Sequence, residues 1–278
     1  MEIIKSIIYG IVEGITEWLP VSSTGHLIIL NEFLPLNVSD GFWNVFEVVI
    51  QLGAILSVIL LYFNKLWPFS LKEKNFLKKD TFNMWFKILV SCIPAAIIGL
   101  LFDEVFEKLF YNTLSVSIAL ISVGILFIFI EKFNKKNTTI NSISEITYKA
   151  AFIIGLFQLV AAIFPGVSRS GATILGALII GVSRVTAAEY TFFLAIPVML
   201  GASLLKLLKF GLAFTSLEIG ILITGMVVSF ITSLFAIKLL MDYVKKHDFK
   251  IFGYYRIILG IILILLMLLG VIWKDLTW

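Results

Sequence analysis

The sequence predicts an all-α polytopic membrane protein with an inverted repeat, each half a re-entrant helical hairpin plus three transmembrane helices. Of its 278 residues, 60% are hydrophobic and only 14% are charged, whereas soluble domains carry about 25% charged residues. Uncharged runs such as 219–237 are long enough to cross about 30 Å of hydrocarbon. The basic residues lie between these runs, which is typical of membrane topology and not of a nucleic-acid-binding patch.

Each half opens with two short helices separated by a polar turn. In residues 3–34 an amphipathic pattern ends near Glu17, Pro20 breaks it, and a second short helix precedes Pro35. Neither piece can cross a bilayer alone, and such a hairpin is stable only where its irregular backbone is buried in protein or lines a cavity. Residues 150–181 repeat the pattern. We therefore predict re-entrant hairpins at 3–34 and 150–181.

Six spans follow the two hairpins in sets of three. They are predicted at about 42–63, 82–102, 113–131, 187–208, 217–241 and 254–273. The chain is then a single membrane domain, 1–278, with repeat one at 1–131, a cytoplasmic linker at 132–149 and repeat two at 150–278. An offset of 145 pairs Gly10 with Gly155, Glu13 with Gln158, Pro20 with Pro165 and Ser23 with Ser168. Because three spans is an odd number, the halves are inverted and the hairpin tips can meet near the midplane.

Lysine distribution predicts which side each loop faces. Segments 64–80 and 132–149 are rich in lysine and are expected in the cytoplasm, whereas the acidic loop 103–112 is expected outside. The first hairpin then enters from the outer face and the second from the inner face. This order favours a site that is open to the outer face.

The two tips concentrate the polar residues of an otherwise apolar chain. Ionisable groups inside a membrane are costly and are functional candidates by default; here they are Glu13, Glu17, His26 and Arg169. Around them are hydroxyl and glycine residues expected to bind a ligand: Ser22, Ser23, Thr24, Gly25, Gly166, Ser168, Ser170 and Thr173. Helix N-termini and an arginine fork suit phosphate oxygens, so we predict an anion site.

The residues leave the roles of the carboxylates and the histidine open. His26 would act as nucleophile, or as base for Ser23 or a water. Glu13 and Glu17 would orient that base or hold Mg²⁺ or Ca²⁺ through oxygen ligands. A purely structural alternative makes Arg169 the ion-pair partner of a carboxylate. Residues expected around the site, with helix-end solvation as the alternative for some, are Glu47, Gln51, Gln158 and Glu189.

The tips contain two long polar motifs: Glu13-Gly14-x-x-Glu17-x-x-Pro20-Val21-Ser22-Ser23-Thr24-Gly25-His26 and Pro165-Gly166-x-Ser168-Arg169-Ser170-Gly171-Ala172-Thr173. They resemble the signature regions of the bacterial undecaprenyl-diphosphatase (bacitracin-resistance) family. The similarity runs essentially end to end. It implies a plasma-membrane enzyme that hydrolyses undecaprenyl diphosphate to the monophosphate and phosphate, recycling the carrier for peptidoglycan synthesis and conferring bacitracin resistance. It also implies a divalent-metal requirement. The implied functional positions are Glu13, Glu17, Ser23, His26 and Arg169, with Ser168 and Thr173 nearby.

A transporter is the competing class. A lipid-phosphate flippase or anion carrier also uses inverted repeats with broken helices at the midplane. A carrier needs an anion cradle but has no need of two carboxylates beside a histidine and a serine, and this cluster favours an enzyme. The expected partners are a polyprenyl diphosphate lipid and the bilayer, without nucleic acid, and the sequence leaves a homodimer open.

Overall fold

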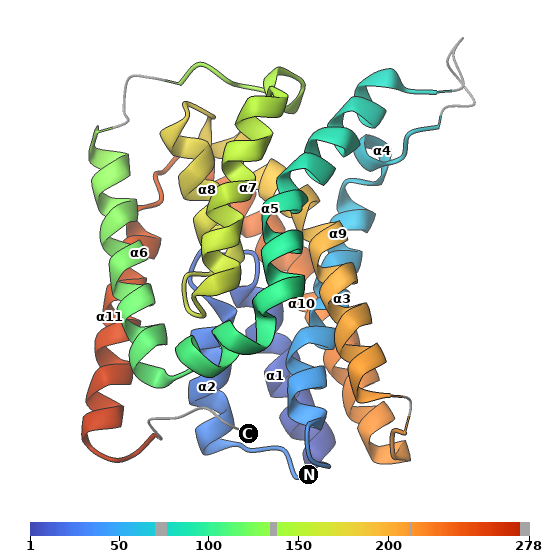
Figure 1. The fold of residues 1–278 in the computed structure, drawn as a ribbon, viewed down its shortest axis with the longest axis vertical. Helices are drawn as coiled ribbons and strands as arrows, with labels where there is room; N and C mark the ends of the chain where they lie inside the picture. Colours follow the sequence, from blue (N-terminus) through green and yellow to red (C-terminus); the bar gives the residue numbers. More distant parts are fainter. Residues whose placement is uncertain (70–76, 134–137, 212, 273–278) are drawn as a thin grey trace.

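A computed structural model describes residues 1–69, 77–133, 138–211 and 213–272, with the backbone alone at 100, 103, 104 and 107. The described chain is all-α, as predicted (Figure 1). Its helices are α1 (Glu2–Thr16), α2 (Ser23–Phe33), α3 (Phe42–Leu61), α4 (Phe63–Leu66), α5 (Lys79–Phe110), α6 (Thr113–Phe133), the 3-10 turn η1 (Ile143–Glu145), α7 (Tyr148–Ile163), α8 (Arg169–Ile179), α9 (Arg184–Phe210), α10 (Ser216–Val244) and α11 (Lys250–Leu268).

Six of the described helices are long and apolar enough to cross a membrane. They are α3, the Lys79–Gly99 part of α5, α6, α9, α10 and α11, which confirms the six predicted spans and a multi-pass membrane protein. The described parts of the lysine-rich segments 64–80 and 132–149 lie at the same end of the bundle (Figure 1). Residues 70–76 and 134–137 of those segments lie outside the described chain.

Both predicted hairpins are helix–turn–helix units. The pair α1 and α2 occupies the lower half of the bundle and the pair α7 and α8 the upper half, with their turns directed toward each other (Figure 1). The inverted repeat and its boundaries stay a prediction.

The two turns have the same local structure, which corrects the predicted pairing of Ser23 with Ser168. Ser22 and Ser168 have φ values of 73° and 70°. Each is the N-cap of the following helix and accepts a hydrogen bond from the amide three residues later. Ser168 therefore corresponds to Ser22, and Arg169 to Ser23. The prediction was one residue out because Ser168 follows Pro165 by three residues, whereas Ser22 follows Pro20 by two.

The predicted acidic loop at 103–112 is wrong. Helix α5 continues through this segment to Phe110, and only Tyr111 and Asn112 separate it from α6. Charge ends a membrane span but not a helix, because Glu and Lys are good helix formers. The side chains of Asp103, Glu104 and Glu107 lie outside the described part of the structure.

Helix α1 turns its polar side inward, against α10. Ser6 Oγ donates to the carbonyl of Ile221 at 2.6 Å, and Ser233 Oγ donates to the carbonyl of Gly14 at 3.2 Å. The opposite side, which includes Ile4, is exposed, as expected for a helix that faces lipid. This packing directs the carboxylates of the first hairpin into the protein.

Candidate functional site at the hairpin tips

Glu17 joins the two hairpins. Its Oε1 accepts a hydrogen bond from Arg169 Nη2 at 2.8 Å, and its Oε2 accepts one from Ser23 Oγ at 2.8 Å. The residue is only 6% exposed. Ser170 Oγ donates to the Glu17 carbonyl at 3.1 Å. Residues that are 152 positions apart in the sequence thus form one buried polar cluster.

Arg169 has a buried N–H donor that no acceptor of the described chain binds. Its Nη1 donates to the carbonyl of Thr191 at 2.9 Å, and its guanidinium lies 5.9 Å from the ring of Trp18. The Nε atom is buried without a hydrogen-bond partner in the described chain. Because a guanidinium binds phosphate oxygens through several donors at once, an unused buried donor favours a ligand at this point.

The remaining hydroxyls of the second hairpin mostly support its own turn. Ser168 Oγ lies 3.0 Å from Ser170 Oγ. Thr173 Oγ1 donates to the carbonyl of Arg169 at 2.9 Å and lies 2.9 Å from Thr191 Oγ1. Thr173 therefore orders the backbone that carries Arg169. In the first hairpin Thr24 is half-buried in the first turn of α2.

Glu13 is a buried carboxylate that lies beside the carboxyl of Glu17 and has no hydrogen-bond donor within the described chain. It is fully buried, and neither of its side-chain oxygens has a hydrogen bond within the described chain. The carboxyls of Glu17 and Glu47 and the guanidinium of Arg169 act on it electrostatically. An unpaired buried charge is strongly unfavourable, so the carboxyl of Glu13 requires either a proton or a bound cation.

The donor set at the tips fits a hard divalent cation. The described residues contain no group of three or more His, Cys, Asp or Glu that could hold a metal. Glu13 and Glu17 supply two carboxylates. Mg²⁺ is commonly bound by one or two carboxylates together with waters and substrate phosphates, so the chemistry of this pair is compatible with such an ion.

His26 is turned away from the carboxylates. Its Nδ1 lies 2.7 Å from the Ser22 carbonyl and its Nε2 lies 2.7 Å from Tyr255 Oη. The two rings are parallel, with centroids 5.6 Å apart. A carbonyl only accepts, so Nδ1 carries the hydrogen and Nε2 accepts from the tyrosine. Both ring nitrogens are thus engaged by groups other than Ser23, and the chemical role of His26 stays a prediction.

The four residues expected around the site divide into two groups. Glu47, which accepts a hydrogen bond from Tyr111 Oη at 3.0 Å, borders the site through its effect on Glu13. The other three direct their polar atoms elsewhere. Gln51 donates to the Glu47 carbonyl, Gln158 Nε2 lies 3.5 Å from the Ser91 carbonyl, and Glu189 forms an ion pair with Lys65.

Two glycines of the tips, Gly25 and Gly166, pack closely against α6, and their role in ligand binding stays a prediction. At Gly166, where φ is 91°, an added Cβ would lie 2.7 Å from the Val116 carbonyl of α6. Gly25 packs against Leu120 in the same way. Both turns therefore rest directly on α6.

Arg256, in the middle of α11, contacts both tips, and the sequence analysis did not identify it. It is 0% exposed; its Nη1 donates to the Pro20 carbonyl at 3.2 Å, and its Nη2 donates to the carbonyls of Gly166 and Val167, both at 2.7 Å. One signal could have found it. An arginine inside the apolar span predicted at 254–273 is an intramembrane ionisable residue and a functional candidate for that reason alone.

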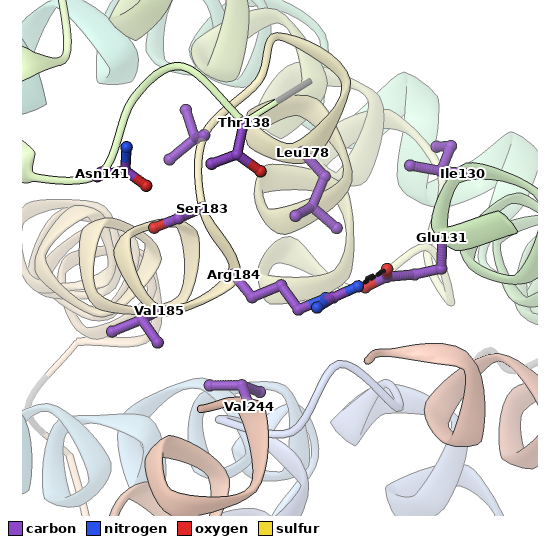
Figure 2. A pocket seen from close by; sticks show the side chains of 10 residues that line it. Ile130, Glu131, Thr138, Asn141, Leu178, Ser183, Arg184, Val185 and Val244 are labelled. Carbon is purple, nitrogen blue, oxygen red and sulfur yellow. Dashed lines mark hydrogen bonds and ion pairs between the residues drawn. The ribbon is translucent and has the colours of Figure 1, made fainter. Parts of the chain in front are cut away.

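A separate polar cavity of about 330 Å³ lies away from the tips, between the ends of α6, α8 and α10 and the start of α9 (Figure 2). There the Arg184 side chain reaches Glu131, with Nη2 2.6 Å from Oε2. Glu131 Oε1 also accepts from the Phe249 amide at 3.0 Å. These groups satisfy one another, and no side-chain polar atom of Arg184 or Glu131 is buried without a hydrogen-bond partner.

The fold and the tips together define a multi-pass membrane protein with a buried cluster of carboxylates, serine and arginine between two broken helices. Residues 6–262 match the family described as bacitracin resistance protein BacA. The chain belongs to this family.

Its relatives agree with that membership. The chain is 68% identical to undecaprenyl-diphosphatase 1 of Clostridium acetobutylicum over 94% of this chain and 95% of the relative. It is 63% identical to undecaprenyl-diphosphatase of Desulfitobacterium hafniense, covering 95% and 96%. It is 56% identical to undecaprenyl-diphosphatase of Enterococcus faecalis, covering 96% and 97%.

Proposed function

We propose that this protein is an integral membrane phosphatase that hydrolyses undecaprenyl diphosphate to undecaprenyl phosphate and inorganic phosphate. The activity recycles the lipid carrier for cell-wall synthesis and confers bacitracin resistance. The observation that carries the proposal is the buried Ser23–Glu17–Arg169 chain of hydrogen bonds between the two tips. Family membership and the near full-length similarity to relatives named undecaprenyl-diphosphatase support it.

The tips suit a diphosphate because they combine positive groups with free donors. Ser23 and Arg169, the first residues of α2 and α8, both bind Glu17, and the amides in these first turns that lack an intrahelical acceptor can donate to phosphate oxygens. The guanidinium of Arg169 would bind the same phosphate and stabilise charge that develops on it during transfer. The polyprenyl chain would extend between helices into the bilayer.

We assign Ser23 as the nucleophile and Glu17 as its base. Ser23 Oγ already donates to Glu17 at 2.8 Å, so the proton has an acceptor when Oγ attacks the terminal phosphorus. The bond from that phosphorus to the bridging oxygen then breaks, and undecaprenyl phosphate leaves. Glu17 would pass its proton to the departing phosphate and then take a proton from a water, whose oxygen attacks the phosphoserine. Inorganic phosphate is released and Ser23 Oγ regains a proton from Glu17. The entering phosphates compete with Glu17 for Arg169, which frees the carboxylate to accept the proton.

A divalent cation, Mg²⁺ or Ca²⁺, would be held by Glu13 and by the Glu17 oxygen that Arg169 releases to the phosphates, while the other Glu17 oxygen stays with Ser23. When bound, the cation would neutralise phosphate charge. The unpartnered oxygens of Glu13 support this assignment. Without a cation, Glu13 would hold a proton beside Glu17.

We also propose the bacterial plasma membrane as the location, with the site open to the outer face. The lysine-rich segments at one end of the bundle support that orientation.

Phosphate release from undecaprenyl diphosphate by purified protein tests the proposal. Wild type, Glu17→Ala and Arg169→Ala are assayed in detergent, each with magnesium and with chelator. Release by the wild type that is lost in both variants is the expected result. Folded wild type that releases no phosphate with metal present would refute a phosphatase and favour a transporter of lipid phosphates or anions.

A further inference from the structure

We propose that Arg256 is a positioning residue of this site. Its guanidinium holds the turns of both hairpins in the arrangement that places Ser23 and Arg169 against one substrate. The inference rests on the proposed phosphatase function and adds a residue of α11 to it.

The contacts of Arg256 cross from one hairpin to the other. Its Nη1 binds the carbonyl of Pro20, in the first turn, and its Nη2 binds the carbonyls of Gly166 and Val167, in the second turn. These carbonyls stand one or two residues before the caps Ser22 and Ser168. One side chain therefore fixes the position of one tip relative to the other.

The carbonyls need such a donor. Both turns are irregular backbone inside a membrane protein, where no bulk water can satisfy a free carbonyl. All three acceptors stand within two residues of a non-glycine residue with positive φ, a conformation that persists only when its surroundings enforce it. The fork of Arg256 supplies donors to both turns at once, which a lysine ammonium reproduces only in part.

The charge of Arg256 has no ion-pair partner in the described chain. Arg169 and Arg184, by contrast, bind the carboxylates of Glu17 and Glu131. Arg256 contacts carbonyls only, and its Nε is buried without a partner. A buried positive charge that lacks a carboxylate favours an anion on the far side of the turns, and the diphosphate would occupy that position.

Arg256 is itself held in a rigid pair of helices. An added Cβ at Gly253 of α11 would lie 2.7 Å from the Gly124 carbonyl of α6, and one at Gly260 would lie 2.9 Å from the Ser117 carbonyl. Such close backbone contact leaves α11 little freedom to move against α6. The second turn rests on α6 as well, through Gly166. The α6–α11 pair thus supports both tips in a fixed position.

Arg256→Met and Arg256→Lys test the role, with Arg184→Lys as the matched control. Steady-state kinetics with undecaprenyl diphosphate are combined with hydrogen–deuterium exchange of residues 17–25 and 164–172. Misplacing reacting groups by about 1 Å costs about 100-fold in rate, so we expect kcat of Arg256→Met to fall by about that factor and KM to rise. Arg256→Lys keeps the charge, so its kcat falls less and its KM stays near wild type.

Both variants of Arg256 should show faster exchange in both turns and unchanged exchange elsewhere, and Arg184→Lys should keep wild-type kcat. If Arg256→Met does not fold, Arg256→Lys and Gly171→Ala carry the test, since a Cβ at position 171 would lie 3.1 Å from Arg256 Nη1 and displace the fork. Wild-type kcat in folded variants, or faster exchange spread over the whole chain, would overturn the proposal. Inactive wild type would instead refute the phosphatase function.

Discussion

Replacing Glu17 by glutamine separates the charge of this residue from its shape. Glu17 accepts from both Arg169 and Ser23 at 2.8 Å and is 6% exposed. Glutamine fills the same space and can still accept one hydrogen bond, but it cannot take the proton of Ser23. The change should therefore affect both stability and catalysis, for different reasons.

The stability loss follows from the buried ion pair. Removing one partner of such a pair costs about 3–5 kcal/mol, and the hydrogen bond that the amide oxygen keeps is worth about 1 kcal/mol. We expect Glu17→Gln to lower the free energy of unfolding by about 2–4 kcal/mol. Loss of a general base lowers the rate by about 10²–10⁴-fold, which corresponds to about 3–5 kcal/mol of transition-state stabilisation.

The matched control is Glu131→Gln. Glu131 is a buried carboxylate paired with Arg184 at 2.6 Å, and it lies outside the tips. The two variants should lose similar stability in unfolding experiments in detergent, but only Glu17→Gln should lose kcat in a phosphate-release assay. Loss of a general base should leave no more than about a hundredth of wild-type kcat. If Glu17→Gln keeps about a tenth or more of wild-type kcat, the assignment of Glu17 as base is wrong.

Three further predictions concern single groups. Ser23→Ala should lower kcat by at least about 100-fold with little change in melting temperature. The control Ser117→Ala removes only a hydroxyl bound to its own helix and should keep wild-type kcat. If Ser23→Ala and Ser117→Ala have equal kcat, Ser23 is not the nucleophile. Gly166→Ala should destabilise the protein by more than about 1–3 kcal/mol, because the position combines positive φ with a contact at 2.7 Å. The control Gly201→Ala lies in open space within α9 and should stabilise the protein by about 0.5–1 kcal/mol. Thermal unfolding in detergent compares the two variants. Glu13→Gln should preserve or raise stability, since it removes an unpaired carboxyl. The same variant should need a higher magnesium concentration for half-maximal phosphate release. An unchanged magnesium requirement would show that Glu13 is not a metal ligand.

The sequence predicts the helices and the polar tips well because both depend on local composition. Six apolar runs are interrupted by charged loops, and prolines break the two hairpins where polar residues gather. Whether Glu13 or Glu17 pairs with Arg169 is not local, because the partners are 152 residues apart. That choice depends on how α1 packs against α10 and turns one carboxylate toward the second hairpin.

The other differences have equally specific causes. His26 follows Ser23 by three residues in a motif that suggests a joint role, yet the start of α2 directs its ring to Tyr255. Arg256 stands alone among apolar residues, and its acceptors are backbone carbonyls, which no side-chain motif reports. The one-residue error between the turns arose because matching letters cannot place an insertion, whereas the two positive φ values do.

The central claim is that the two hairpin tips form one catalytic unit, and a double-mutant cycle across them tests it most directly. Ser23→Ala, Arg169→Gln and the combined variant are compared in kcat for phosphate release from undecaprenyl diphosphate. Residues that act as a unit give non-additive losses, so the double variant should be little worse than the poorer single variant. Losses that multiply would mean that the tips contribute independently, and would contradict a single site between them.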